Sequence, residues 1–209
     1  MEKKAVYPGS FDPFTNGHMD IVRKASAIFD RVYIVMAVNS EKRRAFDCRR
    51  MQEAMERALA DSGIHNCEVS IYDGLIAEYT KHHGIGYMVR GLRNNMDYNY
   101  EENIAEVNKL IDPSLEYVYF RADNVAVSSS MVKELRHYGQ DVSSYVPPAI
   151  AAKYHDNGFV HHAAYGYPPQ AMHPREKVRH CHQEVCAVDL VERGKGPAAA
   201  AVGKGTECA

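Results

Sequence analysis

The sequence predicts an α/β fold, a Rossmann-like doubly wound parallel sheet with helices on both faces. Short strand-like segments alternate along the chain with segments of helical periodicity, which is the pattern that produces such sheets. Residues 32–38 form a nearly continuous apolar run, which is typical of a parallel strand buried on both sides. The N-terminal segment also changes from strand to turn to helix within a few residues.

The first strand is predicted at residues 4–7, because this stretch has the alternating and β-branched character of a short buried strand. Pro8 and Gly9 are expected to end it. Thr15 or Asn16 can cap the helix that follows. One face of this helix is expected to pack on the sheet through apolar residues spaced three and four apart, which are Ile21, Val22, Ala25, Ile28 and Phe29.

The remaining elements follow in alternation. Residues 48–60 are rich in helix formers, and residues 68–72 alternate like a strand. Serines that suit a helix start precede residue 131, and Pro147 and Pro148 suit the first turn of a last short helix ending near residue 158. The predicted strands are 4–7, 32–38, 68–72, 87–89 and 115–120, and the further helices are 48–60, 75–82, 98–110 and 129–138.

Composition limits the function classes. A chain of 209 residues that is 45% hydrophobic can bury one sizeable core, and a net charge of −2 gives no reason to expect nucleic acid as a partner. No stretch approaches the ~20 apolar residues that span a bilayer, so we expect no membrane association and a cytoplasmic protein. Residues 1–158 are predicted to form the domain. Residues 159–209 are rich in Gly, Pro and Ala and are predicted to be a disordered or weakly ordered tail.

The segment YPGSFDPFTNGH, residues 7–18, is the strongest candidate for a functional site. The first-turn amides of a helix lack intrahelical partners, and the helix dipole adds about half a positive charge there, so this position attracts anions. His18 adds a directional donor in that turn, and Ser10 adds a hydroxyl. Gly9 is expected to let a ligand approach the backbone closely.

Basic side chains are expected near the same edge of the sheet. Lys42, Arg43 and Arg44 follow the second strand, and Arg90 and Arg93 follow the strand at 87–89 with Gly91 between them. Ligands of open α/β sheets bind outside the carboxyl ends of the strands, and guanidinium groups can pair with phosphate through two hydrogen bonds. A solvated basic loop is the alternative reading for Arg43 and Arg44.

Residues 15–18 resemble the (H/T)xGH signature of the nucleotidyltransferase superfamily, and residues 7–18 are similar to the opening of bacterial phosphopantetheine adenylyltransferases. Further segments follow in that family's order and near its spacing, at residues 39–46, 90–93, 97–101 and 127–130. The resemblance covers residues 1–158. It implies the nucleotidyltransferase fold and transfer of the adenylyl group of ATP to 4'-phosphopantetheine, giving dephospho-CoA and pyrophosphate in coenzyme A biosynthesis.

The resemblance also implies roles for individual residues. His18, Lys42 and Arg93 are expected to be catalytic, and no side chain is expected to bind a metal ion. Ser10, Lys42, Arg90 and the backbone near Ile76 are expected to bind phosphopantetheine. The residues expected to hold ATP are Ser10, Phe11, His18, Gly91, Leu92, Arg93, Glu101, Asn124, Val125, Ala126, Val127, Ser128, Ser129 and Ser130.

The expected mechanism is in-line attack by the acceptor phosphate on the α-phosphorus of ATP, with Mg²⁺ accompanying the ATP phosphates and His18 as principal donor. The family resemblance suggests a homohexamer made of two trimers. The loop before Ser128 is shorter than the family's, and Asn124 stands where the family generally has an aromatic residue. Two alternatives therefore remain: a related nucleotidyltransferase with another phosphate acceptor, and a noncatalytic nucleotide-binding subunit.

Overall fold

A computed structural model describes residues 2–38, 43–123 and 125–155. Its sheet has five parallel strands in the order β3-β2-β1-β4-β5. The predicted parallel α/β architecture is confirmed. The strands are β1 (Lys4–Gly9), β2 (Arg31–Ala37), β3 (Cys67–Tyr72), β4 (Tyr87–Leu92) and β5 (Glu116–Arg121).

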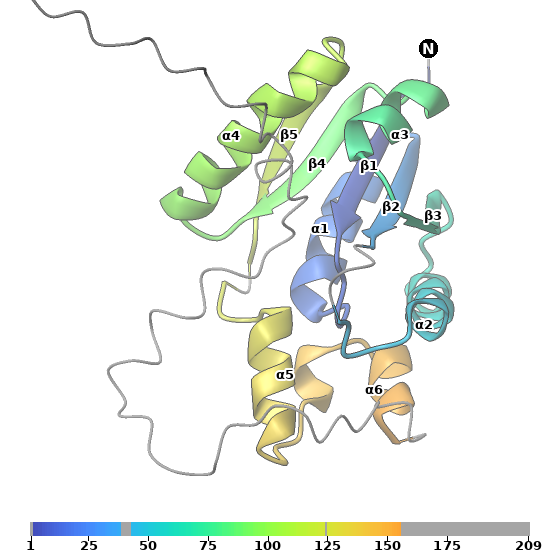
Figure 1. Ribbon diagram of the computed structural model, residues 1–209. Coiled ribbons are helices and arrows are strands. Elements are labelled where there is room, and N and C mark those ends of the chain that lie inside the picture. The colour runs from blue at the N-terminus through green and yellow to red at the C-terminus, as the bar shows by residue number, and fades with distance from the viewer. Residues whose placement is uncertain (1, 39–42, 124, 156–209) are drawn as a thin grey trace, which may run out of the picture.

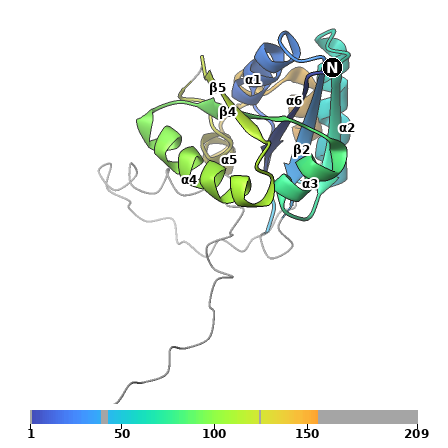
Figure 2. The ribbon, with the colours of Figure 1, turned by 90° about the horizontal axis from the view of Figure 1, so that it is seen from above.

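Helices alternate with these strands and cover both faces of the sheet (Figures 1 and 2). The helices are α1 (Asn16–Ser26), α2 (Cys48–Asp61), α3 (Ile76–His83), α4 (Asn95–Ile111), α5 (Ser129–His137) and α6 (Pro148–His155), with a short 3₁₀ turn η1 (Ser143–Tyr145). In Figure 1, α5 and α6 lie beyond the arrowheads of the strands, so they border the carboxyl edge of the sheet.

The two faces of β1 feed two separate apolar clusters, as the period of a strand requires. Ala5 and Tyr7 belong to the larger cluster, which also contains buried residues of α1, α2, α5 and α6. Val6 points the other way and packs with Ile76 and Tyr79 of α3. Two layers of helices thus bury both faces, and the edge where the strands end is left for a ligand.

The strand β1 continues through Pro8 and Gly9, so the prediction that these residues end it was wrong. Pro8 pairs with Val35 and Gly9 with Met36, whereas pairing with β4 covers only Ala5 and Val6. The proline lacks an N–H, but its carbonyl accepts a hydrogen bond from Arg90 Nη1 at 2.8 Å. A side chain thus continues the link between β1 and β4 where their backbone pairing has stopped.

Ile28 was predicted on the packed face of the first helix, and this is also wrong. The helix ends at Ser26, and the amides of Ile28 and Phe29 both donate to the Ala25 carbonyl in a terminal turn. Helical spacing no longer decides which side chain points inward there. Phe29 is buried, but Ile28 is 55% exposed.

Two expectations fall outside the described residues, namely the tail at 159–209 and the end of the last helix near residue 158. In the part of the chain that the structure describes, no helix is both long and apolar enough to cross a membrane.

Candidate active site

Thr15 caps helix α1 and fixes the hydrogen-bonding state of His18. The Thr15 hydroxyl accepts from the His18 amide, and the Thr15 amide donates in return to His18 Nδ1 at 3.0 Å. This reciprocal pair is a capping box with histidine in the place of the usual Glu or Gln. Because Nδ1 acts as an acceptor, the ring hydrogen of the neutral imidazole sits on Nε2. The helix cap therefore prepares a single N–H donor at the start of α1.

Two aromatic rings confine the His18 side chain. The ring of Phe14 stacks on it with centroids 5.6 Å apart, and Phe11 meets it edge to face at 5.1 Å. Burial, followed by the positive charges of Arg93 and Arg90, lowers the pKa of His18 from 6.5 to about 4. The imidazole is therefore neutral at physiological pH, and it lies close enough to both arginines for their charges to lower its pKa.

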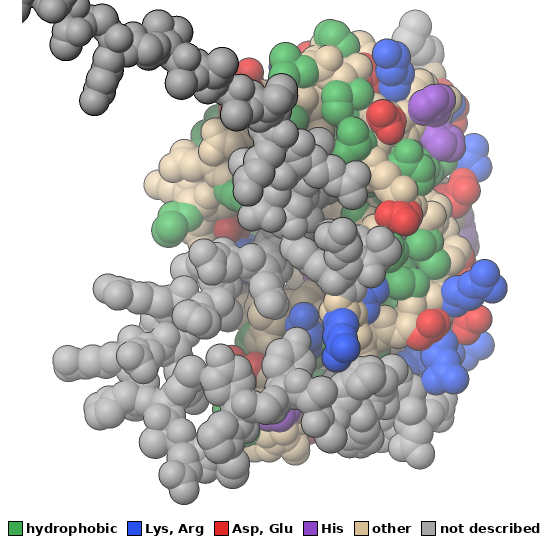
Figure 3. Space-filling view, in the orientation of Figure 1, with side chains coloured by type: hydrophobic (Ala, Val, Ile, Leu, Met, Phe, Trp, Pro, Cys, Tyr) green, Lys and Arg blue, Asp and Glu red, His purple; other side chains and the backbone are tan. Residues whose placement is uncertain are grey.

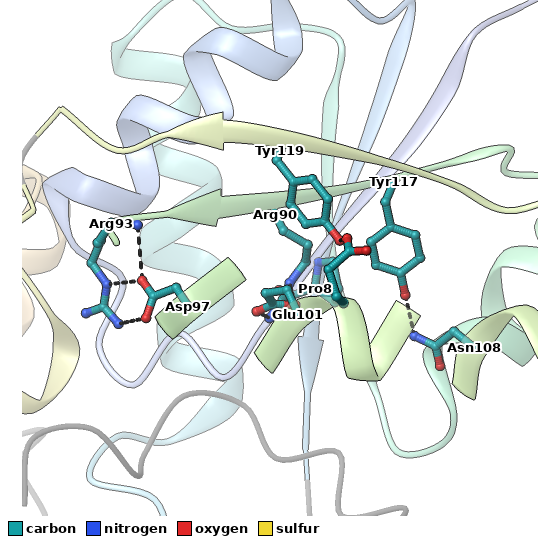
Figure 4. A network of polar contacts seen from close by, with 9 residues as sticks. Pro8, Arg90, Arg93, Asp97, Glu101, Asn108, Tyr117 and Tyr119 are labelled. Atoms are coloured by element: carbon teal, nitrogen blue, oxygen red, sulfur yellow. Dashed lines mark hydrogen bonds and ion pairs between the residues drawn. The ribbon is translucent and has the colours of Figure 1, made fainter. Parts of the chain in front are cut away.

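Arg90 lies inside β4, whereas the sequence prediction placed it after the strand. The strand extends to Leu92, and the Arg90 side chain is buried beneath α4. Its Nε donates to Glu101 Oε2 at 2.7 Å, its Nη2 pairs with Glu101 Oε1, and its Nη1 donates to Pro8 (Figure 4). Arg90 and Glu101 were expected to bind different substrates, but here they form one buried ion pair that joins β4, α4 and β1.

Arg93 follows the end of β4 and is held by Asp97 in the first turn of α4. The Arg93 amide and Nε donate to Asp97 Oδ2 at 3.1 and 2.9 Å, and Nη2 donates to Oδ1 at 3.3 Å. Among the described residues, no group pairs with Arg93 Nη1. Asp97 thus fixes the orientation of the guanidinium group and leaves one of its edges available to a ligand (Figure 4).

Packing accounts for both glycines and for Phe11 at this site. A Cβ at Gly9 would lie 2.7 Å from Phe11 Cζ, and a Cβ at Gly91 would lie 3.0 Å from Ile21 Cγ1. The missing side chain of Gly9 makes room for the Phe11 ring, which is 1% exposed, and Gly91 makes room for α1. The predicted contact of Phe11 with ATP therefore rests on its backbone.

The serine run begins α5 beside the loop that precedes α1. Ser128 is the N-cap, and its hydroxyl accepts from the Met131 amide at 3.1 Å. Ser129 Oγ donates to the Pro13 carbonyl at 2.8 Å, and Ser130 follows in the first turn. Two helix N-termini therefore meet near one loop. Val125, Ala126 and Val127 form the turn just before this start.

A pocket opens at the carboxyl ends of the central strands, on the face of the sheet that α3 and α4 cover. Sequence reasoning found Gly9, Ile76 and Arg90 but missed the other residues that line it. The spacing of Ile104 and Asn108 from Glu101 places them near its side of α4, which is the signal that could have found them. The full lining is Pro8, Gly9, Ala37, Ile76, Met88, Arg90, Ile104 and Asn108.

The structure thus brings most of the predicted site residues to one edge of the sheet. Arg90 and Leu92 belong to β4, Arg93 follows it, and His18 lies in α1, which follows the neighbouring strand β1. Ser10 accepts a hydrogen bond at its carbonyl from Arg44 at 2.6 Å. In Figure 3, some Lys and Arg side chains lie near the middle of the face, below the level where the strands end in Figure 1, and others lie along its right side. Lys42 and Asn124 lie outside the described residues, so their roles stay predictions.

Comparisons with known proteins agree with this geometry. A family model described as cytidylyltransferase-like matches residues 6–135. The chain is 42% identical over 151 residues to a phosphopantetheine adenylyltransferase of Streptococcus uberis, covering 71% of this chain and 90% of that protein. It is 43% identical over 152 residues to the enzyme of that name from Heliobacterium modesticaldum, covering 71% and 89%.

Solved structures share the fold at lower identity. A putative nicotinate-nucleotide adenylyltransferase from Vibrio parahaemolyticus superimposes with a TM-score of 0.58 at 18% identity, covering 76% of this chain and 94% of that one. At 18% identity this similarity supports only the fold and not a shared function. The two relatives near 40% identity are aligned over 90% and 89% of their own length. The chain belongs to the phosphopantetheine adenylyltransferase family, a family of nucleotidyltransferase enzymes.

Proposed function

We propose that this chain transfers the adenylyl group of ATP to 4'-phosphopantetheine, releasing pyrophosphate and forming dephospho-CoA. One observation carries the proposal: His18 presents a neutral N–H donor at the N-terminus of α1, beside Arg93 and the start of α5. The relatives near 40% identity bear the name of this activity. Nicotinamide mononucleotide or glycerol phosphate as acceptor, and nucleotide binding without turnover, are the alternatives.

The reaction proceeds by in-line displacement at phosphorus. An oxygen of the acceptor phosphate forms a bond to the α-phosphorus of ATP, and the bond from that phosphorus to the bridging oxygen of pyrophosphate breaks. No protein base is needed, because the second pKa of a phosphate monoester is ~6 and the attacking oxygen is largely unprotonated at pH 7. His18 could not serve as that base through Nδ1, which already accepts from Thr15. Its Nε2–H instead donates to the charge that develops at the α-phosphate.

The pocket between α3 and α4 suits the arm of the acceptor. Its lining is mainly apolar, and Asn108 adds an amide that donates to Tyr117 Oη at 2.6 Å. A flexible chain of methylenes and amides needs this combination of apolar wall and hydrogen-bonding group. The amide of Ile76 belongs to the first turn of α3 and faces no intrahelical carbonyl, which favours its predicted contact with the acceptor phosphate.

Arg90 and Glu101 support both substrate sites from below. Arg90 lines the acceptor pocket while Glu101 neutralises it, so we propose that Arg90 contributes orientation and a hydrogen-bonding edge more than net charge. Arg93 keeps Nη1 for the ATP phosphates. Lys42 is proposed to meet the acceptor phosphate, and residues 124–130 to meet ATP.

We further propose that Mg²⁺ enters with ATP, held by phosphate oxygens and water, and that it neutralises part of the phosphate charge. The described residues contain no group of three or more His, Cys, Asp or Glu side chains that could hold a metal ion.

A homohexamer is proposed as well, and exposed apolar residues of α4 support a subunit interface. Four of the exposed large hydrophobic side chains of the described residues lie on this helix, namely Met96, Tyr98, Tyr100 and Leu110, and their concentration there favours a contact surface. Light scattering on a sizing column tests the assembly. We also propose a cytoplasmic location, because ATP and 4'-phosphopantetheine are the proposed substrates.

A coupled assay for dephospho-CoA, run beside an assay for pyrophosphate release, tests the reaction. Pyrophosphate release with 4'-phosphopantetheine and not with nicotinamide mononucleotide or glycerol phosphate is the expected result. Release only with one of the other acceptors would select the related-transferase alternative. ATP binding without pyrophosphate exchange would select the noncatalytic one. The same assay on a version ending at Gly158 tests whether the tail matters.

A further inference from the structure

Asp12 is a buried carboxylate that joins two segments far apart in the sequence. It is 6% exposed, and it lies in the loop between β1 and α1. Its two oxygens accept from the backbone amides of Ala45 and Phe46, each at 3.0 Å. Lys133 Nζ of α5 lies 3.7 Å from Oδ2. One side chain therefore contacts the segment before α2 and the helix that carries the serine run.

The residues beside Asp12 are fastened to the same two segments. Arg44 Nη2 donates to the Ser10 carbonyl at 2.6 Å, and Ser129 Oγ donates to the Pro13 carbonyl at 2.8 Å. Between them, Phe11 has a φ of 45°, a left-handed conformation that costs a non-glycine residue energy and persists only when its surroundings enforce it. Residues 10–13 are thus clamped from both sides.

We propose that Asp12 is a positioning residue for the transferase reaction, holding residues 44–46 and the start of α5 at a fixed distance from the N-terminus of α1. This inference rests on the proposed function. Residues 44–46 border the acceptor side through Ser10, α1 carries His18, and α5 carries the serines proposed for ATP. Asp12 contacts residues 44–46 and α5, and it belongs to the loop that leads into α1.

The geometry makes orientation, and not charge at the reacting atoms, the expected contribution. Both Asp12 oxygens are engaged by backbone amides, and its carboxylate would repel a phosphate if it faced one. An in-line displacement depends steeply on alignment, and a misplacement of about 1 Å can cost on the order of 100-fold in rate. Loosening this clamp should therefore reduce kcat more than it weakens the binding of either substrate.

The test compares Asp12→Asn with Asp112→Asn in the full chain. Asp112 is a matched control, because it is 5% exposed and accepts from Thr80 Oγ1 at 3.1 Å and Ser114 Oγ at 2.7 Å. It lies just before β5, at the amino ends of the strands, whereas the site lies at their carboxyl ends. Both variants exchange a buried carboxylate for an amide of nearly the same shape, so a general loss of stability should affect them alike.

For Asp12→Asn we expect kcat to fall roughly 10- to 100-fold, with each KM within about threefold of wild type. Amide hydrogen exchange at Ala45 and Phe46 should also accelerate in this variant. Asp112→Asn should leave kcat and that exchange near wild type, whatever it does to the melting temperature. Steady-state kinetics on the folded fraction and exchange followed by NMR measure both effects.

An unchanged kcat in Asp12→Asn, or an equal kcat loss in both variants, overturns the inference. A loss seen only as a higher KM would also overturn it, because Asp12 would then act on binding and not on alignment. A wild-type chain without any transferase activity would refute the proposed function instead. Exchange at Ala45 and Phe46 would still decide in that case whether Asp12 holds the segment, and unchanged exchange counts against it.

Discussion

Replacing Glu101 by Gln is expected to destabilise the protein by about 3–5 kcal/mol, because it removes the carboxylate charge that pairs with the buried Arg90 guanidinium. The two side chains are only 9% and 5% exposed, so water cannot take over the role of the lost partner. Glu101 accepts from both Nε and Nη2 of Arg90. An amide offers one acceptor at most and turns an NH₂ group toward the other donor, so at least one hydrogen bond is lost with the charge.

Urea unfolding followed by circular dichroism measures the effect, with the melting temperature as a second readout. For a domain of this size, each kcal/mol shifts the melting temperature by roughly 2–4 °C, which predicts a decrease of roughly 6–20 °C. Glu102→Gln is the matched control on the same helix. Its carboxylate accepts from the Tyr119 hydroxyl at 2.6 Å and pairs with no arginine among the described residues, so about 1 kcal/mol is expected.

A free-energy loss below about 1 kcal/mol in Glu101→Gln, equal to that of Glu102→Gln, would refute this reasoning. A double variant, Arg90→Met with Glu101→Met, separates the pair from its surroundings. Removing both charges should recover most of the stability, since apolar replacements of buried pairs are often neutral. The double variant should nevertheless lose turnover, because the Arg90 side chain lines the acceptor pocket.

Four further predictions concern single residues. His18→Ala should lower kcat roughly 100- to 1000-fold with an unchanged fold, and turnover within tenfold of wild type would reject His18 as principal donor. In an NMR titration the His18 ring should show a pKa of about 4 in place of 6.5, so the ring stays neutral between these two pH values. A loss of activity below about pH 6 would then be caused by protonation of the acceptor phosphate and not of His18. Gly91→Ala should cost about 1–3 kcal/mol in urea unfolding, because its Cβ would lie 3.0 Å from Ile21 Cγ1 and 3.1 Å from Cδ1; Ile21→Val removes only Cδ1 and should therefore restore part of this loss. Ser128→Ala should cost about 1 kcal/mol through the lost N-cap, and a larger rise in the KM for ATP than in that for the acceptor would add a binding role.

Most of the fold could be predicted from the sequence because local patterns specify it. Apolar patterns, helix-forming residues and capping residues predicted the five strands and the starts of the α-helices to within a few residues, and Thr15 was correctly named as one of two possible caps. The 3₁₀ turn η1 was not predicted. The capping box itself was also readable, since Thr15 and His18 have the required spacing, but histidine is not its usual partner. The convergence of His18 with the arginines followed from the rule that parallel strands end at the same edge.

Side-chain pairing between elements could not be predicted. No local sequence pattern indicates that Arg90 faces Glu101 across the interface of β4 and α4. The strand was predicted to end at Val89, but it extends to Leu92, so Arg90 lies in the core and not in a loop. The contacts of Asp12 could not be predicted either, because its hydrogen-bond donors are backbone amides more than thirty residues away in the sequence. Ile28 failed for the reverse reason: its spacing was helical, but the helix had already ended.

The three basic side chains nearest the start of α1, His18, Arg90 and Arg93, present little unpaired positive charge. Glu101 pairs with Arg90, Asp97 pairs with Arg93, and His18 is uncharged. Helix N-termini and oriented N–H groups therefore contribute to the attraction of anions there, beside Arg44, whose Nη2 donates to the neutral Ser10 carbonyl. Such donors are fixed before ATP arrives and require no reorganisation when charge develops at the α-phosphorus. They also bind the pyrophosphate product less tightly than a cluster of free cations would. Under the proposed function, donors of this kind would stabilise the transition state more than the anionic ground states, which is the condition for rapid turnover.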